Sequence, residues 1–229
     1  MTEKSFSTPG SFLILAHHPE KGGFLISQIY VQYGIAGALL LELALEERVT
    51  ITDRKLSLKP GRASSSPWLN DVITLISQSP KTRKTDYWVR KLATRYNKYK
   101  WQILEELAKK MVFRIENRKF LGLIPYRLSY FTESYTRTNL VRRLKSEILS
   151  NRYASGESNA LAGLVKACNM QRLIANDRDE SRRIRDQLKL MVSDSPVNDV
   201  LAQTIKQVQA AIITSVTTAV IASTASGRH

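Results

Sequence analysis

The segment spanning residues 24–48 constrains the fold more than any other part of the chain. If it forms a helix, almost every side of that helix is apolar. Its centre is the run Gly37-Ala38-Leu39-Leu40-Leu41-Glu42-Leu43-Ala44-Leu45. A helix with a single apolar stripe can lie at the surface, whereas a helix that is apolar all round must be buried on several sides. The sequence therefore predicts a central helix that other helices cover.

Other segments have the spacing of the helices that would form this cover. Apolar residues three or four positions apart predict helices over residues 11–16, 68–77, 139–149, 158–175 and 177–192, and one long helix from Asp86 to Met111. Alternating residues predict a hairpin at 49–58, and a second from 112–115 to 120–124 with its turn at Glu116-Asn117. We expect a mostly α protein: a single globular domain over residues 1–229, with apolar central helices wrapped by amphipathic helices and one or two short β-hairpins.

The C-terminal segment allows two interpretations. Residues 208–225 carry no charge, and their number is near that needed to cross a bilayer. However, six of them are Ser or Thr, and an apolar stripe continues into them from a polar stretch, through Val200, Ile205, Val208, Ile212 and Val216. The pattern favours a buried C-terminal helix, with a transmembrane span as the alternative.

The positive charge is concentrated in the middle of the chain. The formal net charge is +15 and the pI is about 10.0. Residues 80–147 hold 18 basic and 6 acidic side chains, whereas residues 1–79 hold 7 of each. Such a concentration indicates a polyanionic partner, either nucleic acid or an anionic membrane surface, although a solubilising surface is the alternative.

The sequence contains few of the residues that enzymes and metal sites require. Cys168 is the only cysteine, which excludes an internal disulfide and suits a reducing cytoplasm. The adjacent pair His17-His18 has no second cluster of metal ligands, and no phosphate-binding glycine loop or nucleophile elbow is present. The N-terminal segment has no visible secretory signal. We expect a cytoplasmic protein that is not an enzyme and has neither a catalytic residue nor a metal or cofactor.

Three parts of the chain resemble the Golgi phosphoprotein 3 family, whose peripheral membrane proteins include bacterial members. The first part is the run Phe12-Leu13-Ile14-Leu15-Ala16 followed by the helix at 39–45, Arg48 and a hairpin. The second is residues 103–112, a hairpin ending at 120–123, and residues 138–149. The third is the order of the tail segments at 161–167 and 182–191 and the apolar last helix. The resemblance covers essentially the whole chain.

This resemblance implies a mostly helical domain that binds an anionic phospholipid, phosphatidylinositol 4-phosphate in eukaryotic members, on a basic face. It also implies a hairpin that inserts into the membrane or associates with a second copy, and a role as an adaptor for the cytoplasmic tails of membrane proteins. A Trp and an Arg of the family's lipid pocket correspond to positions near Ser27 and at Ala36, and an Arg pair corresponds to Trp101 and Leu104, so this sequence lacks those pocket side chains.

Two groups of residues are the candidate binding site. The cations that we expect at an anionic membrane are Arg90, Lys91, Arg95, Lys98, Lys100, Arg142, Arg143 and Lys145. The candidate membrane or oligomer contact is the second hairpin, with Arg118, Lys119, Phe120, Leu121, Leu123 and Ile124. The alternatives are that the cations are merely solvated and that the apolar residues, Phe120 and Leu123 above all, pack into the core.

The main competing function is nucleic-acid binding. A helix followed by a hairpin occurs twice beside dense Lys and Arg, as in a winged-helix protein, with residues 84–100 on phosphates and residues 114–119 as the wing. The most basic helix also carries the longest apolar stripe, which leaves no identifiable recognition helix. Nucleic acid is therefore the less favoured partner.

Overall fold

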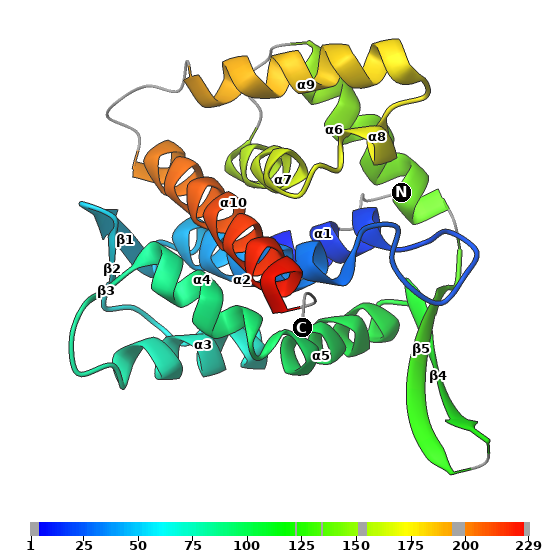
Figure 1. Cartoon of the computed structure of the whole chain (residues 1–229), viewed down its shortest axis with the longest axis horizontal. Coiled ribbons are helices and arrows are strands. Elements are labelled where there is room, and N and C mark those ends of the chain that lie inside the picture. The colour runs from blue at the N-terminus through cyan, green and yellow to red at the C-terminus, as the bar shows by residue number, and fades with distance from the viewer. Residues whose placement is uncertain (1–4, 122, 134, 151–154, 194–199, 227–229) are drawn as a thin grey trace.

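The two most apolar helices form the centre of the molecule. The computed structural model describes residues 5–121, 123–133, 135–150, 155–193 and 200–226. In helix α1 (Thr8–Ala16) all nine residues are buried, and in α2 (Gln28–Leu45) the buried residues extend from Val31 to Leu43. The remaining helices surround this pair (Figure 1). The prediction of a buried central helix is confirmed.

The described residues form ten helices and two small antiparallel sheets, so the predicted mostly α fold is confirmed. The other helices are α3 (Pro67–Ser77), α4 (Thr85–Ala93), α5 (Tyr96–Lys109), α6 (Tyr135–Leu149), α7 (Gly156–Ala167), α8 (Gln171–Ile174), α9 (Arg178–Ser193) and α10 (Val200–Ser226). One sheet has the order β1 (Val49–Thr52), β2 (Lys55–Leu58) and β3 (Arg83–Lys84). The other is the hairpin of β4 (Phe113–Phe120) and β5 (Ile124–Phe131).

Buried polar contacts fix the central helices to each other and to the outer layer. The Glu42 carboxylate of α2 accepts a 2.7 Å hydrogen bond from the Thr8 backbone N–H, which is otherwise unpaired in the first turn of α1. Burial raises the pKa of Glu42, and the hydrogen bond to Thr8 opposes this effect. On the outside, the Arg137 guanidinium of α6 donates to the backbone oxygens of Leu15 and Leu173, which joins α6 to α1 and α8.

The predicted long helix from Asp86 to Met111 is two helices, α4 and α5, and this prediction was wrong. The chain leaves the helical path at Thr94 and Arg95, which lie between them. Trp88, Leu92 and Ile103 are buried as the apolar spacing predicted, so both helices face the core. Asp86 lies in the first turn of α4, where it forms a 2.8 Å ion pair with Arg90.

The predicted turn of the second hairpin was also wrong. Glu116 and Asn117 lie inside β4 and pair with Leu128 and Arg127 of β5. The strands continue in register to the Phe120–Ile124 pair, so the segment predicted as a strand is the end of the hairpin. Leu121 adopts a left-handed conformation there, with φ of 49°.

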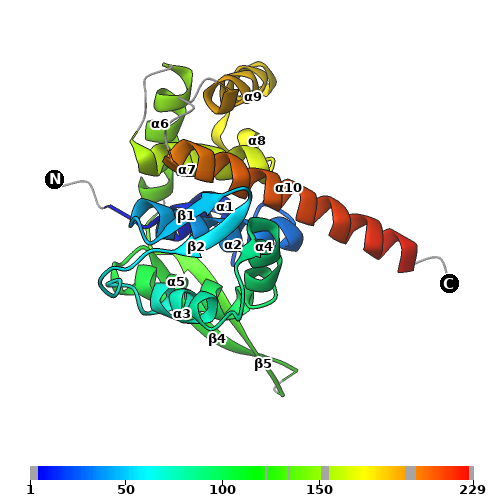
Figure 2. The same cartoon turned by 90° about the vertical axis from the view of Figure 1, so that its left-hand side faces the viewer.

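Helix α10 is buried only in part, which corrects the expectation of a buried C-terminal helix. Val208, Ile212 and Val216 are buried against the body, whose neighbouring elements are α2, α4 and α7. Figure 2 shows the C-terminal part of α10 projecting beyond the other helices. Segments of α2 and α10 both have the length and mean hydropathy of a membrane span, 1.3 in each, with 56% of the first and 39% of the second buried within the protein.

The close contact of α1 with α2 requires a glycine. A Cβ at Gly34 would lie 2.1 Å from Cζ of Phe12, which is closer than any real contact. We expect Gly34→Ala to lower the free energy of unfolding by about 1–3 kcal/mol, since the ring must shift within a packed core. The measurement is urea unfolding followed by circular dichroism. Gln32→Ala, at a half-buried position of the same helix, is the control. Equal stability of Gly34→Ala and the parent would show that the core accommodates the methyl group.

Candidate functional site

The base of the β4–β5 hairpin is anchored in a buried aromatic cluster. The His17 ring, at the end of α1, lies 4.8 Å from the Phe113 ring and 5.3 Å from the Phe131 ring, centroid to centroid. Phe113 and Phe131 are paired residues of β4 and β5, and their rings are 4.4 Å apart. Both strands are thus fixed to the body at their first pair, while the rest of the hairpin projects away from it (Figure 1).

Two hydrogen bonds determine the state of the His17 imidazole. Nδ1 lies 2.8 Å from the His18 carbonyl oxygen, which can only accept, so Nδ1 carries the proton. Nε2 lies 2.8 Å from the Ser129 hydroxyl of β5, which then donates to it. Burial lowers the pKa of His17, and the hydrogen bonds to His18 and Ser129 oppose this effect in part. The hairpin base therefore contains a neutral histidine at neutral pH.

The middle of the hairpin contacts α5 through an aromatic and cationic cluster. The Arg127 guanidinium of β5 lies 4.3 Å from the Trp101 ring centroid and forms a 2.7 Å ion pair with Glu105. The Lys100 ammonium is 4.7 Å from the Trp101 ring centroid. Burial lowers the pKa of Lys100, and the positive charge of Arg127 adds to this effect. Two cations thus meet at one indole ring beside the hairpin.

On β4, two cations share one carboxylate. Glu116 pairs with both Arg114 and Arg118, the latter at 2.6 Å. The guanidinium carbons of the same two arginines lie 4.8 and 5.8 Å from the ring centroid of Tyr130. One negative charge therefore faces two positive charges. Lys119 adds a further positive charge near the outer end of β4.

The hairpin ends in four exposed apolar side chains. The exposed fractions are 58% for Phe120, 81% for Leu121, 83% for Leu123 and 62% for Ile124. The alternative that Phe120 and Leu123 pack into the core is therefore wrong. We call these four residues the hairpin tip. The hairpin tip begins directly after Arg118 and Lys119 in the sequence. An apolar surface and a cationic surface therefore adjoin at the end of the hairpin farthest from its base.

Five of the predicted membrane cations lie on or between α4 and α5. We call Arg90, Lys91, Arg95, Lys98 and Lys100 the α4–α5 group. Arg90 pairs with Asp86, and Lys98 pairs with Asp71 of α3 at 2.5 Å, with both of these pairs at the surface. Surface pairs of this kind contribute roughly 0–1 kcal/mol, so an anionic surface can compete for these cations.

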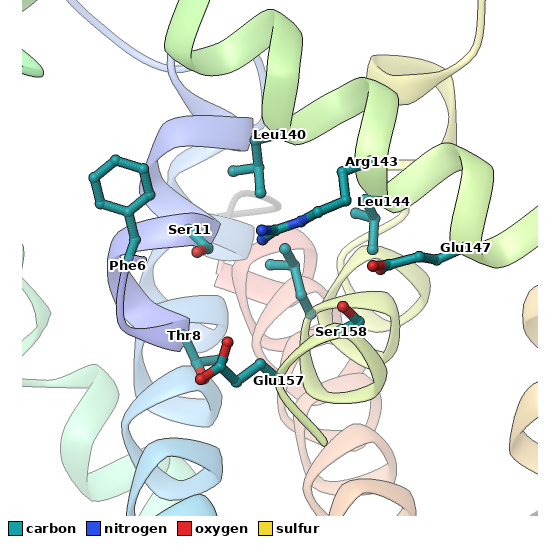
Figure 3. A pocket seen from close by; sticks show the side chains of 10 residues that line it. Phe6, Thr8, Ser11, Leu140, Arg143, Leu144, Glu147, Glu157 and Ser158 are labelled. Atoms are coloured by element: carbon teal, nitrogen blue, oxygen red, sulfur yellow. The ribbon is translucent and has the colours of Figure 1, made fainter. Parts of the chain in front are cut away.

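The other three predicted cations, the α6 group, are Arg142, Arg143 and Lys145. Arg142 is exposed, whereas Lys145 forms a 3.2 Å ion pair with Glu180 of α9 in a largely buried position. Figure 3 shows the Arg143 side chain directed into a narrow pocket between α1, α6 and α7, which Glu147 and Glu157 also line. This pocket has about 10 Å³ of free volume, room for about one water and not for a lipid headgroup.

The structure does not bring the two cationic groups together. Helix α6 lies above the α1–α2 pair in Figures 1 and 2, and α5 lies below it. The hairpin is on the α5 side, where Lys100 adjoins Arg127. The binding role of both groups stays a prediction. A flat membrane surface in contact with the hairpin would lie closer to the α4–α5 group than to the α6 group.

Sequence reasoning missed a second basic surface, at the junction of α8 and α9. Arg172, Arg178, Arg182 and Arg185 line an open groove of about 580 Å³ together with Asp177. Arg182 also pairs weakly with Asp179, at 3.4 Å. The signal in the sequence was the spacing of Arg178, Arg182 and Arg185, three or four residues apart. The acidic residues between them hid it, because the net charge of the segment is small.

The described residues offer little for metal or thiol chemistry. No group of three or more His, Cys, Asp or Glu among them is arranged to hold a metal ion. Burial raises the pKa of the Cys168 thiol, which lies in the core, so this group is protonated and shielded from solvent.

A mostly helical body with an apolar core pair and a projecting, basic, apolar-tipped hairpin is the arrangement that the resemblance implied. A family model described as Golgi phosphoprotein 3 (GPP34) matches residues 9–208. The match covers most of the sequence, so the chain belongs to the Golgi phosphoprotein 3 family. A search of curated proteins found no match.

The neutral His17 at the hairpin base predicts a pH-dependent stability. Its folded pKa lies below the value of 6.5 for a free histidine, so the unfolded chain binds more protons as the pH falls below about 6.5. We expect the free energy of unfolding to decrease from pH 7 to pH 5, and a single histidine such as His17 can contribute at most about 1.4 kcal/mol per pH unit to this slope. Urea unfolding at a series of pH values measures this slope.

His17→Gln removes this titrating group, so its slope should be shallower than that of the parent. Gln32→Ala, a change at a half-buried position of α2 that does not titrate, is the control and should keep the parent slope. Identical slopes in all three proteins would show that His17 is not a source of the acid sensitivity.

Proposed function

We propose that this protein binds peripherally to anionic phospholipid membranes through the β4–β5 hairpin and the cations beside it. The observation that carries the proposal is the hairpin tip, where Phe120, Leu121, Leu123 and Ile124 are all more than half exposed beside Arg118 and Lys119. Exposed apolar residues next to cations are the combination typical of interfacial membrane anchors. Membership of the Golgi phosphoprotein 3 family supports the same function.

Two physical effects contribute to binding, and they differ in their response to salt. Full burial of one large apolar side chain contributes about 1.5–3 kcal/mol, so four partly exposed ones supply several kcal/mol when they enter lipid. Each cation near an anionic bilayer contributes about 1 kcal/mol. Salt screens the second effect beyond about 10 Å at 0.1 M, but it leaves the first.

The finer parts of the function are also proposals. The α4–α5 group supplies further attraction to a phosphoinositide-like headgroup, and Arg142, Arg143 and Lys145 of the α6 group do so only if the membrane reaches that side. Family membership supports an adaptor role, in which the cytoplasmic tails of membrane proteins are partners, and a hairpin contact with a second copy of the chain. These roles place the protein in the cytoplasm, at the face of a membrane.

The hairpin tip is tested by replacing its most exposed residues. We expect Leu121→Ser with Leu123→Ser to weaken binding to phosphatidylcholine–phosphatidylserine vesicles by at least about tenfold, because roughly two leucine side chains no longer leave water. The measurement is vesicle co-sedimentation at low and high salt, with the loss greater in the salt-resistant fraction. The fold should be unchanged, since both side chains are exposed.

Met111→Ser is the matched control, because Met111 is an exposed apolar residue outside the tip. Binding of the parent protein to anionic vesicles no stronger than to pure phosphatidylcholine at low salt would contradict the proposal. Duplex DNA that binds with similar affinity and competes with vesicles would instead favour the nucleic-acid function.

The cations are tested separately on the two sides of the molecule. We expect Arg118→Ala with Lys119→Ala to reduce binding to the same anionic vesicles by about 30-fold at low salt, as two contributions of about 1 kcal/mol are lost. The salt dependence of the remaining binding should be shallower. The measurement is co-sedimentation over a salt series.

Arg142→Ala with Arg172→Ala removes two exposed cations from the opposite side and is the charge-matched control. We expect it to retain nearly full binding. An equal loss in both double variants would show that membrane attraction is a property of the total charge and not of the hairpin side.

A further inference from the structure

Helix α10 has two halves with different surroundings. Its inner half is packed on the body, where Val208, Ile212 and Val216 are buried. Its outer half, beyond Val216, projects from the body (Figure 2). Between Lys206 and Arg228 the sequence has no charged residue. The match to the family ends at residue 208, so the outer half lies beyond the part of the chain that the family describes.

An apolar flank that the protein does not cover begins at Ile213, near the end of the inner half, and continues along the outer half. Ile213 is 47% exposed, Val220 is 45% exposed and Ile221 is 62% exposed. Positions 213, 220 and 221 are seven and eight residues apart, which places their side chains on the same side of an α-helix. A helix in water normally has charged residues on its free side, and α10 has none after Lys206.

Two polar side chains on this part of α10, Thr217 and Thr218, are satisfied within the helix. The Thr217 hydroxyl donates to the Ile213 carbonyl oxygen at 2.8 Å, and the Thr218 hydroxyl donates to the Thr214 carbonyl oxygen at 2.9 Å. A hydroxyl that donates to the carbonyl four residues earlier does not lose its hydrogen bond when it leaves water. The threonines therefore add little to the cost of moving this surface into an apolar environment.

The length of the free part decides between spanning a membrane and lying in its surface. Residues 217–226 continue beyond the packed half and are ten in number, which corresponds to about 15 Å of helix. The hydrocarbon core of a bilayer is about 30 Å thick. This segment can enter one leaflet but cannot cross both, so contact at the boundary of headgroups and acyl chains is the geometry that fits it.

The direction of α10 agrees with that of the hairpin. In Figure 2 the outer half of α10 and the β4–β5 hairpin both run toward the lower right and project past the other helices. One flat surface on that side can meet both. We propose that the outer half of α10 is a second lipid contact, which lays the flank of Ile213, Val220 and Ile221 into the anionic membrane that the hairpin binds. This inference rests on the proposed function.

The experiment places an environment-sensitive dye at each of the two contacts. Ile221→Cys and Leu121→Cys are labelled with a nitrobenzoxadiazole dye, which the buried Cys168 should not take up. The labelled proteins are mixed with phosphatidylcholine–phosphatidylserine vesicles, with and without brominated acyl chains. We expect the emission of both dyes to shift to the blue and to be quenched by the brominated lipid.

The outcomes separate this inference from the proposed function. A response at position 121 without one at 221 overturns the second contact and leaves the hairpin as the anchor. Absence of vesicle binding by either protein overturns the proposed function and this inference with it. A blue shift at 221 that grows with protein concentration in the absence of vesicles shows that a second copy of the chain covers the flank, and this also overturns the proposal.

A pair of variants tests the contribution of the flank without a dye. We expect Val220→Asn with Ile221→Asn to weaken binding to the same vesicles by at least about tenfold, and the loss should persist at high salt because it is apolar in origin. Gln203→Asn with Ala210→Asn changes exposed positions on the inner half of α10, which packs on the body, and is the control. Equal binding by the two double variants overturns the proposal, and their circular dichroism spectra check that both are folded.

Discussion

The structure depends on the burial of two helices that have no polar face. Every residue of α1 is buried, and α2 is buried along most of its length, so neither helix can lie at the surface of any arrangement. The amphipathic helices then have only one stable role, which is to cover this pair with their apolar stripes. Gly34 lets Phe12 approach α2, and Glu42 provides the buried acceptor for the start of α1. The elements that reach outward, the β4–β5 hairpin and α10, are held by the body along their inner parts.

The positions of the cationic side chains also follow from the burial of α1 and α2. A concentration of basic residues in the sequence becomes a basic surface only if the fold brings them to one side, and here α1 and α2 separate α5 from α6 (Figure 1). Several cations meet carboxylates of the protein itself: Lys145 meets Glu180, Lys98 meets Asp71, and Arg127 meets Glu105. The cations beside the hairpin tip differ in that they adjoin exposed apolar side chains. Net charge thus indicates the class of partner, whereas the location of apolar surface beside the charge indicates the side that binds it.

The sequence predicted the core and the helices well because their signals are local and periodic. Apolar residues at helical spacing place Leu140, Leu144 and Ile148 of α6 on a buried stripe, and the structure confirms it. The break at Thr94 and Arg95 could not be predicted in this way, since the apolar spacing continues across it and neither residue is a helix breaker.

The hairpin turn was misplaced for a related reason. Glu116 and Asn117 are typical turn residues, but the pairing of the two strands placed them inside β4. The partners of Lys98, Arg127 and Lys145 depend on tertiary contacts and carry no sequence signal, unlike the local pair of Asp86 with Arg90.

In the proposed function, the hairpin and the outer half of α10 together orient the protein on a membrane, which electrostatic attraction alone does not do. Cations hold a protein near an anionic bilayer, but their attraction fades within about 10 Å at 0.1 M salt and does not orient the molecule strongly. The apolar tip of the hairpin adds a contact that salt does not screen, yet a single narrow hairpin leaves the body free to tilt about it. A second apolar contact at the outer half of α10, projecting to the same side in Figure 2, removes that freedom. Because α10 packs on α2 with its inner half and the hairpin is fixed to α1 through His17, both contacts are rigidly connected to the central pair. In the proposed function, two anchors of this kind define the side that the protein turns to the membrane, and they leave the groove of α8 and α9 on the opposite side, accessible from the solvent.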